Sequence, residues 1–442
     1  MSAGRRPRVL HIVTGLGTGG AEQQLRLLLR HLPDPYTCDV VTLTNPGAVA
    51  AGLRADGVRV TDLGMRGNRD LGALPRLVRL IRDGGYDIVH THLYRACVYG
   101  RIAARIAGVR AVVATEHSLG ADEIEGRALT RGVRALYLGT ERLGGVTVAV
   151  SDTVAERLAE WGVPPYRIHT VPNGIDAARF RFDPSARAAV RARLGIAPDT
   201  YAIGGVGRLV PGKRFDSVLR TVAAIPGTVA LLAGAGPEHP RLSRLAGELG
   251  VTERVHFLGD CGAALPDGTG PSGTGRAEPG PPLPGGGESR TAAAVPGARS
   301  RDRDGRPDVP AAGVTVPDLL GALDLFVSAS REEAFGLAVV EALAAGVPVV
   351  YRTCPAVADL PPGEVPGARR VGAADAELIA AVRDAIAADR PPGREPAPGV
   401  ARYDIRRTAE RVAAVYTHLL DGAPPPLPHQ TSHPDPIERA HR

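Results

Sequence analysis

The sequence predicts an α/β fold built from two Rossmann-like, doubly wound domains. Strand-like apolar segments alternate with helical segments in two separate runs, which begin at Arg8–Val13 and at Ala202–Val206. Such alternation is typical of a parallel sheet covered by helices on both faces. The chain has 442 residues, too many for one ordinary domain, and its 44% hydrophobic content is enough for two cores.

The first run consists of buried-type strands separated by amphipathic segments. We expect strands at Arg8–Val13, Asp39–Leu43, Val58–Asp62, Asp87–His90, Ala111–Thr115, Thr147–Val150 and Arg167–Val171. The intervening segments predict helices at about Ala21–His31, Leu71–Asp83, Arg95–Ala107, Ala128–Arg142 and Ser151–Trp161.

The second run repeats this pattern. Its expected strands are Ala202–Val206, Thr228–Ala233, Arg254–Leu258, Leu325–Val327 and a strand that ends at Val350. Its expected helices are Arg214–Ala224, Pro240–Leu249, Val316–Ala322, Ala334–Ala345, Ala374–Ala388 and Asp404–Leu420. The last of these carries a stripe of apolar residues, Ile405, Val412, Val415, Tyr416 and Leu419, as a helix packed on a core should.

Domain boundaries follow from where the pattern stops and restarts. We place an N-terminal domain at residues 1–172, a C-terminal domain at 173–402, a final helix at 403–420 and a tail at 421–442. Residues 262–312 interrupt the C-terminal domain and consist largely of Gly, Pro, Ser, Thr and Arg. This composition cannot bury a core, so we predict a disordered insertion there, and likewise a disordered Pro-rich tail.

Composition narrows the functional classes. The four cysteines lack CxxC spacing, which argues against a disulfide framework or a zinc site and fits a cytoplasmic location. We see no secretory signal and no apolar run of membrane-spanning length. A net charge of +6 allows contact with phosphate groups or an anionic membrane surface, and we expect no nucleic-acid partner.

A glycine-rich loop follows the first strand. Gly15-Leu16-Gly17-Thr18-Gly19-Gly20 matches G-x-G-x-x-G between a strand and a helix, which is the dinucleotide-binding fingerprint. That fingerprint also needs an acidic residue at the end of the second strand, but this strand ends Val41-Thr42-Leu43-Thr44-Asn45. The loop therefore indicates a close backbone approach to some ligand, with a purely steric turn as the alternative. Glu22, just beyond, is expected to complement the helix dipole.

A second loop, after the first strand of the second domain, concentrates positive charge. It contains Arg208 and Lys213, and Lys213 is the only lysine in the chain. Ligands of doubly wound sheets bind at the carboxyl ends of strands, and both side chains are suited to phosphate. The alternative is a loop with ordinary surface charges.

The segment Ser328–Val350 combines a polar turn, a helix and a buried strand. Glu341 falls on an otherwise apolar helical stripe, where a carboxylate needs a partner, and Glu333 lies at the mouth of the turn. The amides of the turn Ala334–Leu337 would form an anion site at the helix N-terminus. Phosphates on these amides and ribose hydroxyls on Glu341 would suit a nucleotide. The alternative is a helix with a partly exposed glutamate.

Three histidines lie near the carboxyl ends of predicted strands: His90, His92 and His117. Each of them would ordinarily be a satisfied core or rim residue. Because three of them gather at one sheet edge, we expect at least one ligand contact, and we favour His117.

The segment 127–142 is a predicted basic helix. It carries Arg127, Arg131, Arg134 and Arg142 with leucines and Tyr137 between them. It suits either an anionic membrane surface or a solvated helix face, and the sequence leaves both readings open.

Taken together, the chain resembles the retaining GT-B glycosyltransferases of family 4, also called glycosyl transferases group 1. The resemblance rests on five segments in order: GTGGAE, VPNGID (171–176), GRLVPGKRFD (207–216), GAGP (234–237) and EAFGLAVVEALAAGVPVV (333–350). It implies that the N-terminal domain binds the acceptor and that the helix at 403–420 crosses back onto that domain. The C-terminal domain would bind a nucleotide-diphospho-sugar.

The resemblance also implies roles for individual residues. Arg208 and Lys213 would grip the diphosphate and stabilise the leaving group, while Glu341 would hold the ribose. Glu333 and His117 would lie near the reacting sugar. The residues implied to cradle the sugar and phosphate are Phe335, Gly336 and Leu337 from one domain and Gly19 and Gly20 from the other. Fixed cations and helix-end amides can stabilise a departing diphosphate without a metal or other cofactor, and we expect none.

These observations predict a metal-independent transfer of a sugar from a UDP- or GDP-type donor to a glycan or lipid-linked acceptor. Cell-envelope polysaccharide or glycolipid synthesis, at the inner face of a membrane, is the setting that the resemblance and the basic helix favour. An NAD-linked dehydrogenase that uses Gly15–Gly20 is one alternative, and a non-catalytic sugar-nucleotide-binding protein is another. The Pro-rich segment Pro355–Gly367 departs from the family pattern and leaves the donor open.

Overall fold

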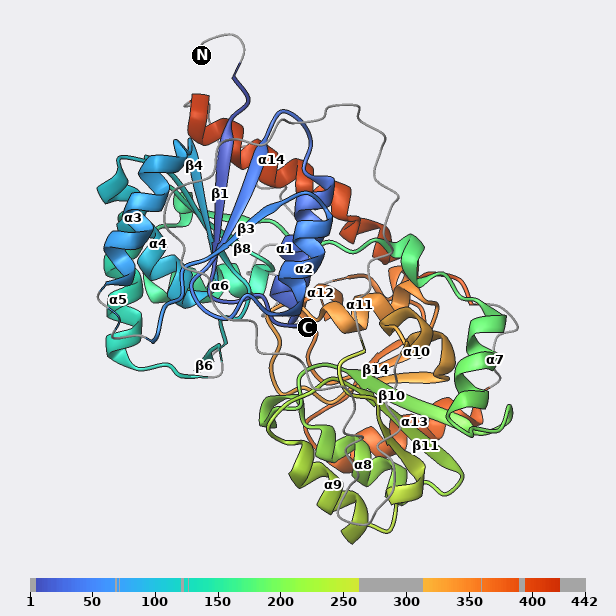
Figure 1. Cartoon of the computed structure of the whole chain (residues 1–442). Coiled ribbons are helices and arrows are strands. Elements are labelled where there is room, and N and C mark those ends of the chain that lie inside the picture. Colours follow the sequence, from blue (N-terminus) through green and yellow to red (C-terminus); the bar gives the residue numbers. More distant parts are fainter. Residues whose placement is uncertain are drawn as a thin grey trace, which may run out of the picture.

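A computed structural model describes residues 5–67, 70, 72–120, 123–125, 127–261, 313–358, 360–388 and 394–421. Two domains, each with its own parallel sheet, lie side by side (Figure 1). The predicted insertion at 262–312 and the tail from residue 422 onwards lie outside the described residues. Within the described part, no helix is long and apolar enough to cross a membrane.

The N-terminal domain is built on a seven-stranded sheet in the order β3-β2-β1-β4-β5-β8-β9. Its strands are β1 (Arg8–Val13), β2 (Thr37–Thr42), β3 (Arg59–Asp62), β4 (Ile88–His92), β5 (Ala111–Glu116), β8 (Val146–Ala149) and β9 (Ile168–Thr170). Its helices are α1 (Gly20–His31), α2 (Gly47–Ala55), α3 (Ala73–Gly84), α4 (Tyr94–Ala107), α5 (Arg131–Glu141) and α6 (Asp152–Trp161).

The C-terminal domain repeats the topology in a six-stranded sheet, β12-β11-β10-β13-β14-β15. Its strands are β10 (Tyr201–Val206), β11 (Thr228–Ala233), β12 (Val255–Phe257), β13 (Leu325–Ser328), β14 (Val349–Tyr351) and β15 (Ala368–Arg370). Its helices are α7 (Pro184–Arg193), α8 (Phe215–Ala224), α9 (His239–Glu248), α10 (Val316–Ala322), α11 (Leu337–Ala344), α12 (Pro355–Ala358) and α13 (Asp375–Ala387).

All the strand pairings in the two large sheets are parallel, so the predicted fold class is confirmed. In each sheet the strand order reverses beside the first strand, between β1 and β4 and between β10 and β13. This reversal is the place where doubly wound sheets bind ligands. The loops that follow these four strands carry most of the predicted site residues, whereas His117 follows β5 and Glu341 lies within α11.

The last helix, α14 (Ile405–Asp421), leaves the C-terminal domain and packs on the N-terminal sheet (Figure 1). Val412 and Tyr416 share a buried apolar cluster with Val9 of β1 and Val113 of β5. The apolar stripe predicted for this helix is therefore its contact with the other domain. Because α14 joins the domain boundary to the first sheet, it ties the two domains together.

The structure corrects two predicted helices at their N-terminal ends. The basic helix begins at Arg131, because the Thr130 hydroxyl caps it by accepting a hydrogen bond from the Val133 amide. Arg127, which was predicted to lie near its start, belongs instead to a short hairpin of β6 (Glu123–Ile124) and β7 (Arg127–Ala128). Similarly, α11 begins at Leu337 and not at Ala334. Gly336 has a left-handed backbone, φ +100°, which a right-handed helix cannot include.

Candidate functional site

The glycine-rich loop after β1 faces the loops of the C-terminal domain across the domain interface. The Thr18 hydroxyl donates to the Asp260 carboxylate at 3.1 Å. A β-carbon added at Gly20 would lie 3.2 Å from Leu337 at the start of α11. Gly20 therefore approaches the first turn of α11 closely, and a side chain at position 20 would crowd the interface. The approach of this loop to a ligand stays a prediction.

Further along the interface, polar contacts hold the two domains in register. Arg157 of α6 forms an ion pair with Glu332 at 2.8 Å, and the Ser151 hydroxyl donates to the Ala334 carbonyl at 2.6 Å. In the C-terminal domain, Ala334 begins the turn that precedes α11, and Glu332 lies two residues before it. This turn, which carries the predicted anion site, is thus fixed by the N-terminal domain as well as by its own. Arg157 was not predicted from the sequence as a site residue.

Lys213 and Glu333 meet at the carboxyl ends of β10 and β13. The Lys213 Nζ lies 2.5 Å from Glu333 Oε1, and both side chains are mostly buried. Lys213 ends a short 3₁₀ turn, Pro211–Lys213, and Glu333 lies in the loop after β13, 120 residues away. Their contact places a fixed cation and a carboxylate side by side at the reversal of the strand order.

The turn Ala334–Leu337 leads directly into α11. The left-handed Gly336 caps the helix, and its carbonyl accepts from the amides of Val339 and Val340. The first amides of an α-helix have no carbonyl partner within the helix, so those at its N-terminus face outward as donors. Phe335 is buried against the ring of Tyr403, which holds the turn in place. The turn therefore presents the donors that an anion requires, next to Lys213 and Glu333.

Glu341 lies within α11, partly buried, with the charge of Arg179 nearby. Burial raises the pKa of its carboxyl from the ordinary 4.5 to about 7, and the Arg179 guanidinium opposes this increase. Arg179 belongs to the short 3₁₀ helix Ala177–Phe180, just after the VPNGID segment. Arg179 was not predicted as a site residue, because nothing in its local sequence pattern indicates that it approaches α11.

We expect the raised pKa of Glu341 to make stability depend on pH. A carboxyl whose pKa is higher in the folded state stabilises the fold only while protonated, so this contribution is lost as pH rises from about 4.5 to about 7. The total is about 3 kcal/mol. Glu341→Gln should abolish this pH-dependent loss of stability. The variant should therefore be more stable than the wild type at pH 8 and no more stable than the wild type at pH 4. Urea unfolding of both proteins at the two pH values measures the difference, and parallel pH curves would contradict it.

Arg208 and Glu22 belong to different domains and interact electrostatically. Burial raises the pKa of the Glu22 carboxyl, and the charge of Arg208 lowers it in part. A β-carbon at Gly19 would lie 2.4 Å from the Glu22 carboxylate, so a glycine at this position gives the carboxylate room. Arg208 itself is exposed. Glu22 therefore faces the candidate phosphate-binding arginine, a role that the helix-dipole interpretation did not include.

His117 follows β5 and lines a small cavity of about 30 Å³. The cavity lies between the N-terminal sheet and α14, and Gln24, Asn173 and Thr408 are among its lining residues. Burial lowers the pKa of His117 to about 4, so the ring is neutral at physiological pH. The hydrogen bond described for His117 runs to His92, at 3.2 Å between Nε2 and Nδ1. No described hydrogen bond joins His117 to Lys213 or Glu333.

Two sheets whose strand ends meet at one interface, with phosphate-suited groups on both sides, define the GT-B class of two-domain α/β proteins. The solved structures agree. HepE from Anabaena, in complex with UDP and glucose, has a TM-score of 0.70 at 21% identity, over 92% of this chain and 98% of that one. Sucrose-phosphate synthase from Thermosynechococcus elongatus has a TM-score of 0.66 at 17% identity, over 94% and 100% of the two chains. At these identities the likeness establishes the fold.

Two family models match the sequence. Residues 18–179 match Glycosyltransferase Family 4, and residues 287–388 match Glycosyl transferases group 1. The resemblance to the family 4, group 1 glycosyltransferases that the motifs predicted is therefore confirmed, although each model matches less than half of the chain.

Curated relatives are consistent with these matches. The D-inositol 3-phosphate glycosyltransferase of Mycobacterium tuberculosis (strain ATCC 25177 / H37Ra) is 32% identical over 282 residues, which is 60% of this chain and 47% of the relative. The Mycobacterium marinum (strain ATCC BAA-535 / M) protein of the same name is 30% identical over 283 residues, 60% and 48% of the two chains. The matched part thus spans about half the length of these relatives.

Proposed function

We propose that this protein transfers a sugar from a nucleotide-diphospho-sugar to a glycan or lipid-linked acceptor with retention of the anomeric configuration. The observation that carries the proposal is the Lys213–Glu333 pair beside the first turn of α11. Departure of a nucleoside diphosphate builds up negative charge. A fixed ammonium group and preorganised amides stabilise such charge without rearranging.

In the proposed complex the diphosphate lies on Lys213, Arg208 and the amides of Phe335, Gly336 and Leu337. Glu341 accepts from the ribose hydroxyls, which favours its ionised form. Gly19 and Gly20 admit the diphosphate closely from the other domain. Glu333 and His117 contact sugar hydroxyls. A UDP-type donor is supported by the likeness to HepE, which was crystallised with UDP-glucose.

A thermal-shift screen of the intact protein tests the donor. We expect one nucleoside diphosphate, UDP or GDP, to raise the melting temperature most, because a ligand at 100 times its dissociation constant stabilises by about 2.7 kcal/mol. Turnover of the corresponding nucleotide sugar, with the product anomer read by NMR, then tests transfer and retention. Binding without any turnover would indicate a non-catalytic sugar-nucleotide-binding protein. A shift with NAD alone would indicate the dehydrogenase, which the family matches do not favour.

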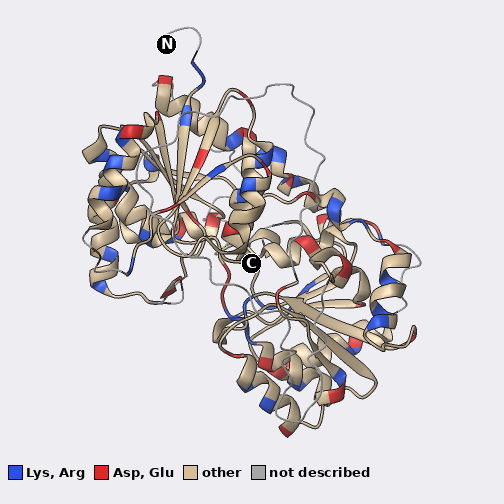
Figure 2. Ribbon diagram, viewed as in Figure 1, with Lys and Arg blue, Asp and Glu red and all other residues tan. Residues whose placement is uncertain are grey.

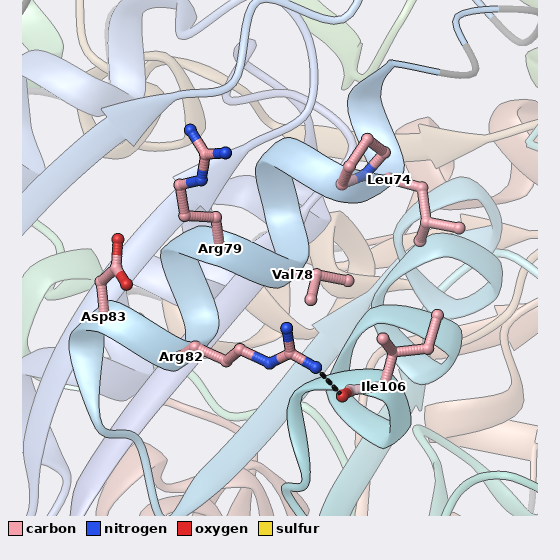
Figure 3. A pocket seen from close by; sticks show the side chains of 7 residues that line it. Leu74, Val78, Arg79, Arg82, Asp83 and Ile106 are labelled. Carbon is pink, nitrogen blue, oxygen red and sulfur yellow. Dashed lines mark hydrogen bonds between the residues drawn. The ribbon is translucent and has the colours of Figure 1, made fainter.

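We also propose that the outer face of the N-terminal domain contacts an anionic membrane, where a lipid-linked acceptor would be found. A groove of about 530 Å³ between α3 and α4 is lined by the apolar residues Val78 and Ile106 together with Arg79, Arg82 and Asp83 (Figure 3). Ile106 and, on the neighbouring α5, Leu136 are half exposed. Basic positions recur along these helices, drawn in blue in Figure 2. The exposed ones are Arg76, Arg79, Arg82, Arg105, Arg131 and Arg134, with Arg142 just after α5.

The membrane proposal predicts charge-dependent binding to vesicles. Each arginine near an anionic surface contributes about 1 kcal/mol, so a variant with Arg79, Arg82 and Arg105 replaced by glutamine should bind about 100-fold more weakly. Co-sedimentation with phosphatidylglycerol vesicles measures this, with phosphatidylcholine vesicles and Arg220→Gln, an exposed arginine of the other domain, as controls. Equal sedimentation of variant and wild type would contradict the proposal.

A further inference from the structure

Four histidines and a tyrosine form a buried hydrogen-bonded chain behind the candidate site. His11 lies on β1, His92 on β4 and His117 just after β5, and these strands are neighbours in the sheet. The His11 Nδ1 lies 3.0 Å from the His92 Nε2, and the His92 Nδ1 lies 3.2 Å from the His117 Nε2. The rings stack in pairs, with interplanar angles of 17° and 28°. The chain therefore runs from the core to the cavity beside His117.

The inner end of the chain meets α14. The Tyr416 hydroxyl lies 2.6 Å from the His90 Nδ1 and 3.5 Å from the His11 Nε2. The other nitrogen of His90 lies 2.7 Å from the Thr115 hydroxyl. The ligating nitrogens of His11, His90 and His92 fall within 4.8 Å of one another, but both nitrogens of His90 are already engaged. The cluster is thus arranged as a hydrogen-bond chain and not as a metal cage.

Every ring in the chain is neutral at physiological pH. Burial lowers the pKa of His11 to about 3 and that of His117 to about 4, and lowers those of His90 and His92 well below the ordinary value. A neutral imidazole donates from one nitrogen and accepts at the other. In a chain of such rings, the orientation of one ring therefore fixes the orientation of the next.

The Tyr416 hydroxyl has one proton, and the distances decide where it points. The 2.6 Å contact with His90 is strong and the 3.5 Å contact with His11 is long and weak, so Tyr416 donates its proton to His90 and its oxygen is left to accept from His11. His11 then carries its proton on Nε2, directed at the tyrosine oxygen, and accepts at Nδ1 from His92 Nε2–H. His92 in turn accepts at Nδ1 from His117 Nε2–H. The remaining nitrogen of His117, Nδ1, is left with a lone pair.

The His117 Nδ1 is fully buried and has no hydrogen-bond partner among the described residues. The cavity of about 30 Å³ that His117 lines has room for one water molecule or one hydroxyl group. A buried acceptor without a partner is costly, so a hydroxyl that donates to it should bind favourably. In this site the hydroxyl would come from a sugar.

We propose that Tyr416 is a positioning residue that acts through His11 and His92 to hold His117 as a hydrogen-bond acceptor toward a sugar hydroxyl. Through Tyr416, α14 would thus determine whether His117 accepts or donates a hydrogen bond at the candidate site. The sugar as ligand rests on the proposed function, whereas the ordering of the histidine protons does not.

The test is Tyr416→Phe in the full-length protein, with ¹⁵N-labelled histidine. Without the hydroxyl, His11 loses the group that orients it, so His117 should change from one neutral tautomer, with the proton on Nε2, to a mixture, which the ¹⁵N shifts report. Loss of one hydrogen bond of about 1.4 kcal/mol at the sugar should lower kcat about tenfold. Tyr36→Phe is the matched control, because its hydroxyl bonds to Ala413 and Thr417 of the same helix and its ring packs on Tyr416.

An unchanged His117 tautomer in Tyr416→Phe, or the same change in Tyr36→Phe, would overturn the proposal. Zinc bound to the purified protein through His11, His90 and His92 would also overturn it, since a metal would occupy nitrogens that the chain uses. The tautomer measurement needs no substrate. Failure of the wild type to transfer sugar would therefore refute the proposed function, whereas the ¹⁵N shifts of His117 would still test the histidine chain.

Discussion

Lys213→Ala is expected to lower kcat for sugar transfer by about 10²- to 10³-fold, which is the usual effect of removing one preorganised group that stabilises an oxyanion. Lys213 is the cation held against Glu333 at the end of β10, and its Nζ is 2.5 Å from that carboxylate. Alanine would remove the charge that we assign to the departing diphosphate, and would leave Glu333 to repel it. The donor should therefore bind more weakly as well as react more slowly.

The measurement is steady-state turnover of the nucleotide sugar identified by the thermal-shift screen. Arg220→Ala is the control, because Arg220 is an exposed cation of α8 in the same domain whose charge pairs loosely with Asp375, at 3.8 Å. Circular dichroism and a melting curve establish that each variant is folded. A kcat within threefold of wild type in a folded Lys213→Ala protein would remove Lys213 from the site and, with it, the observation that carries the proposed function.

The architecture was predictable because its signals are local. The segments Thr228–Ala233 and Val316–Ala322 have the same bounds in the sequence prediction and in the structure. In contrast, β15 is a three-residue strand at the sheet edge that follows a Pro-rich segment, and it is too short to show a periodic pattern. The helix α7 was also not predicted, because two of its inward positions are arginines. Arg187 and Arg191 bind the Asp324 carboxylate and backbone carbonyls where an apolar stripe would otherwise lie.

The sequence indicates which residues are candidates for the site, but it does not indicate which of them contact one another. The sequence shows that Lys213 is the only lysine and that Glu333 lies in a polar turn, but their contact spans 120 residues. The approach of Arg179 to Glu341 and the bond between Tyr416 and His90, which spans 326 residues, depend on how the two sheets and α14 pack. No short-range pattern contains that information. The motif resemblance could bring these distant segments into one candidate site because it links them in a fixed order.

Gly336→Ala is expected to destabilise the protein by about 2–5 kcal/mol and to weaken donor binding. Two physical effects add. The left-handed backbone, φ +100°, costs a residue with a side chain about 1–2 kcal/mol. In addition, the new β-carbon would lie 2.3 Å from the Cys354 Sγ, and such overpacking costs about 1–3 kcal/mol more. Relief of the clash would shift the amides of Phe335 and Leu337, which we assign to the phosphate.

Two matched variants separate these effects in urea unfolding. Gly250 has φ +68° with open space around its missing side chain, so Gly250→Ala should show the backbone cost alone. In a Cys354→Ala background the nearest atom to the new β-carbon becomes the β-carbon of residue 354, at 3.3 Å, which small shifts can accommodate. There the cost of Gly336→Ala should fall to that of Gly250→Ala, while nucleotide affinity recovers. Equal costs for Gly336→Ala and Gly250→Ala in the wild-type background would show that the turn before α11 tolerates a side chain and is not held as tightly as its role at the phosphate requires.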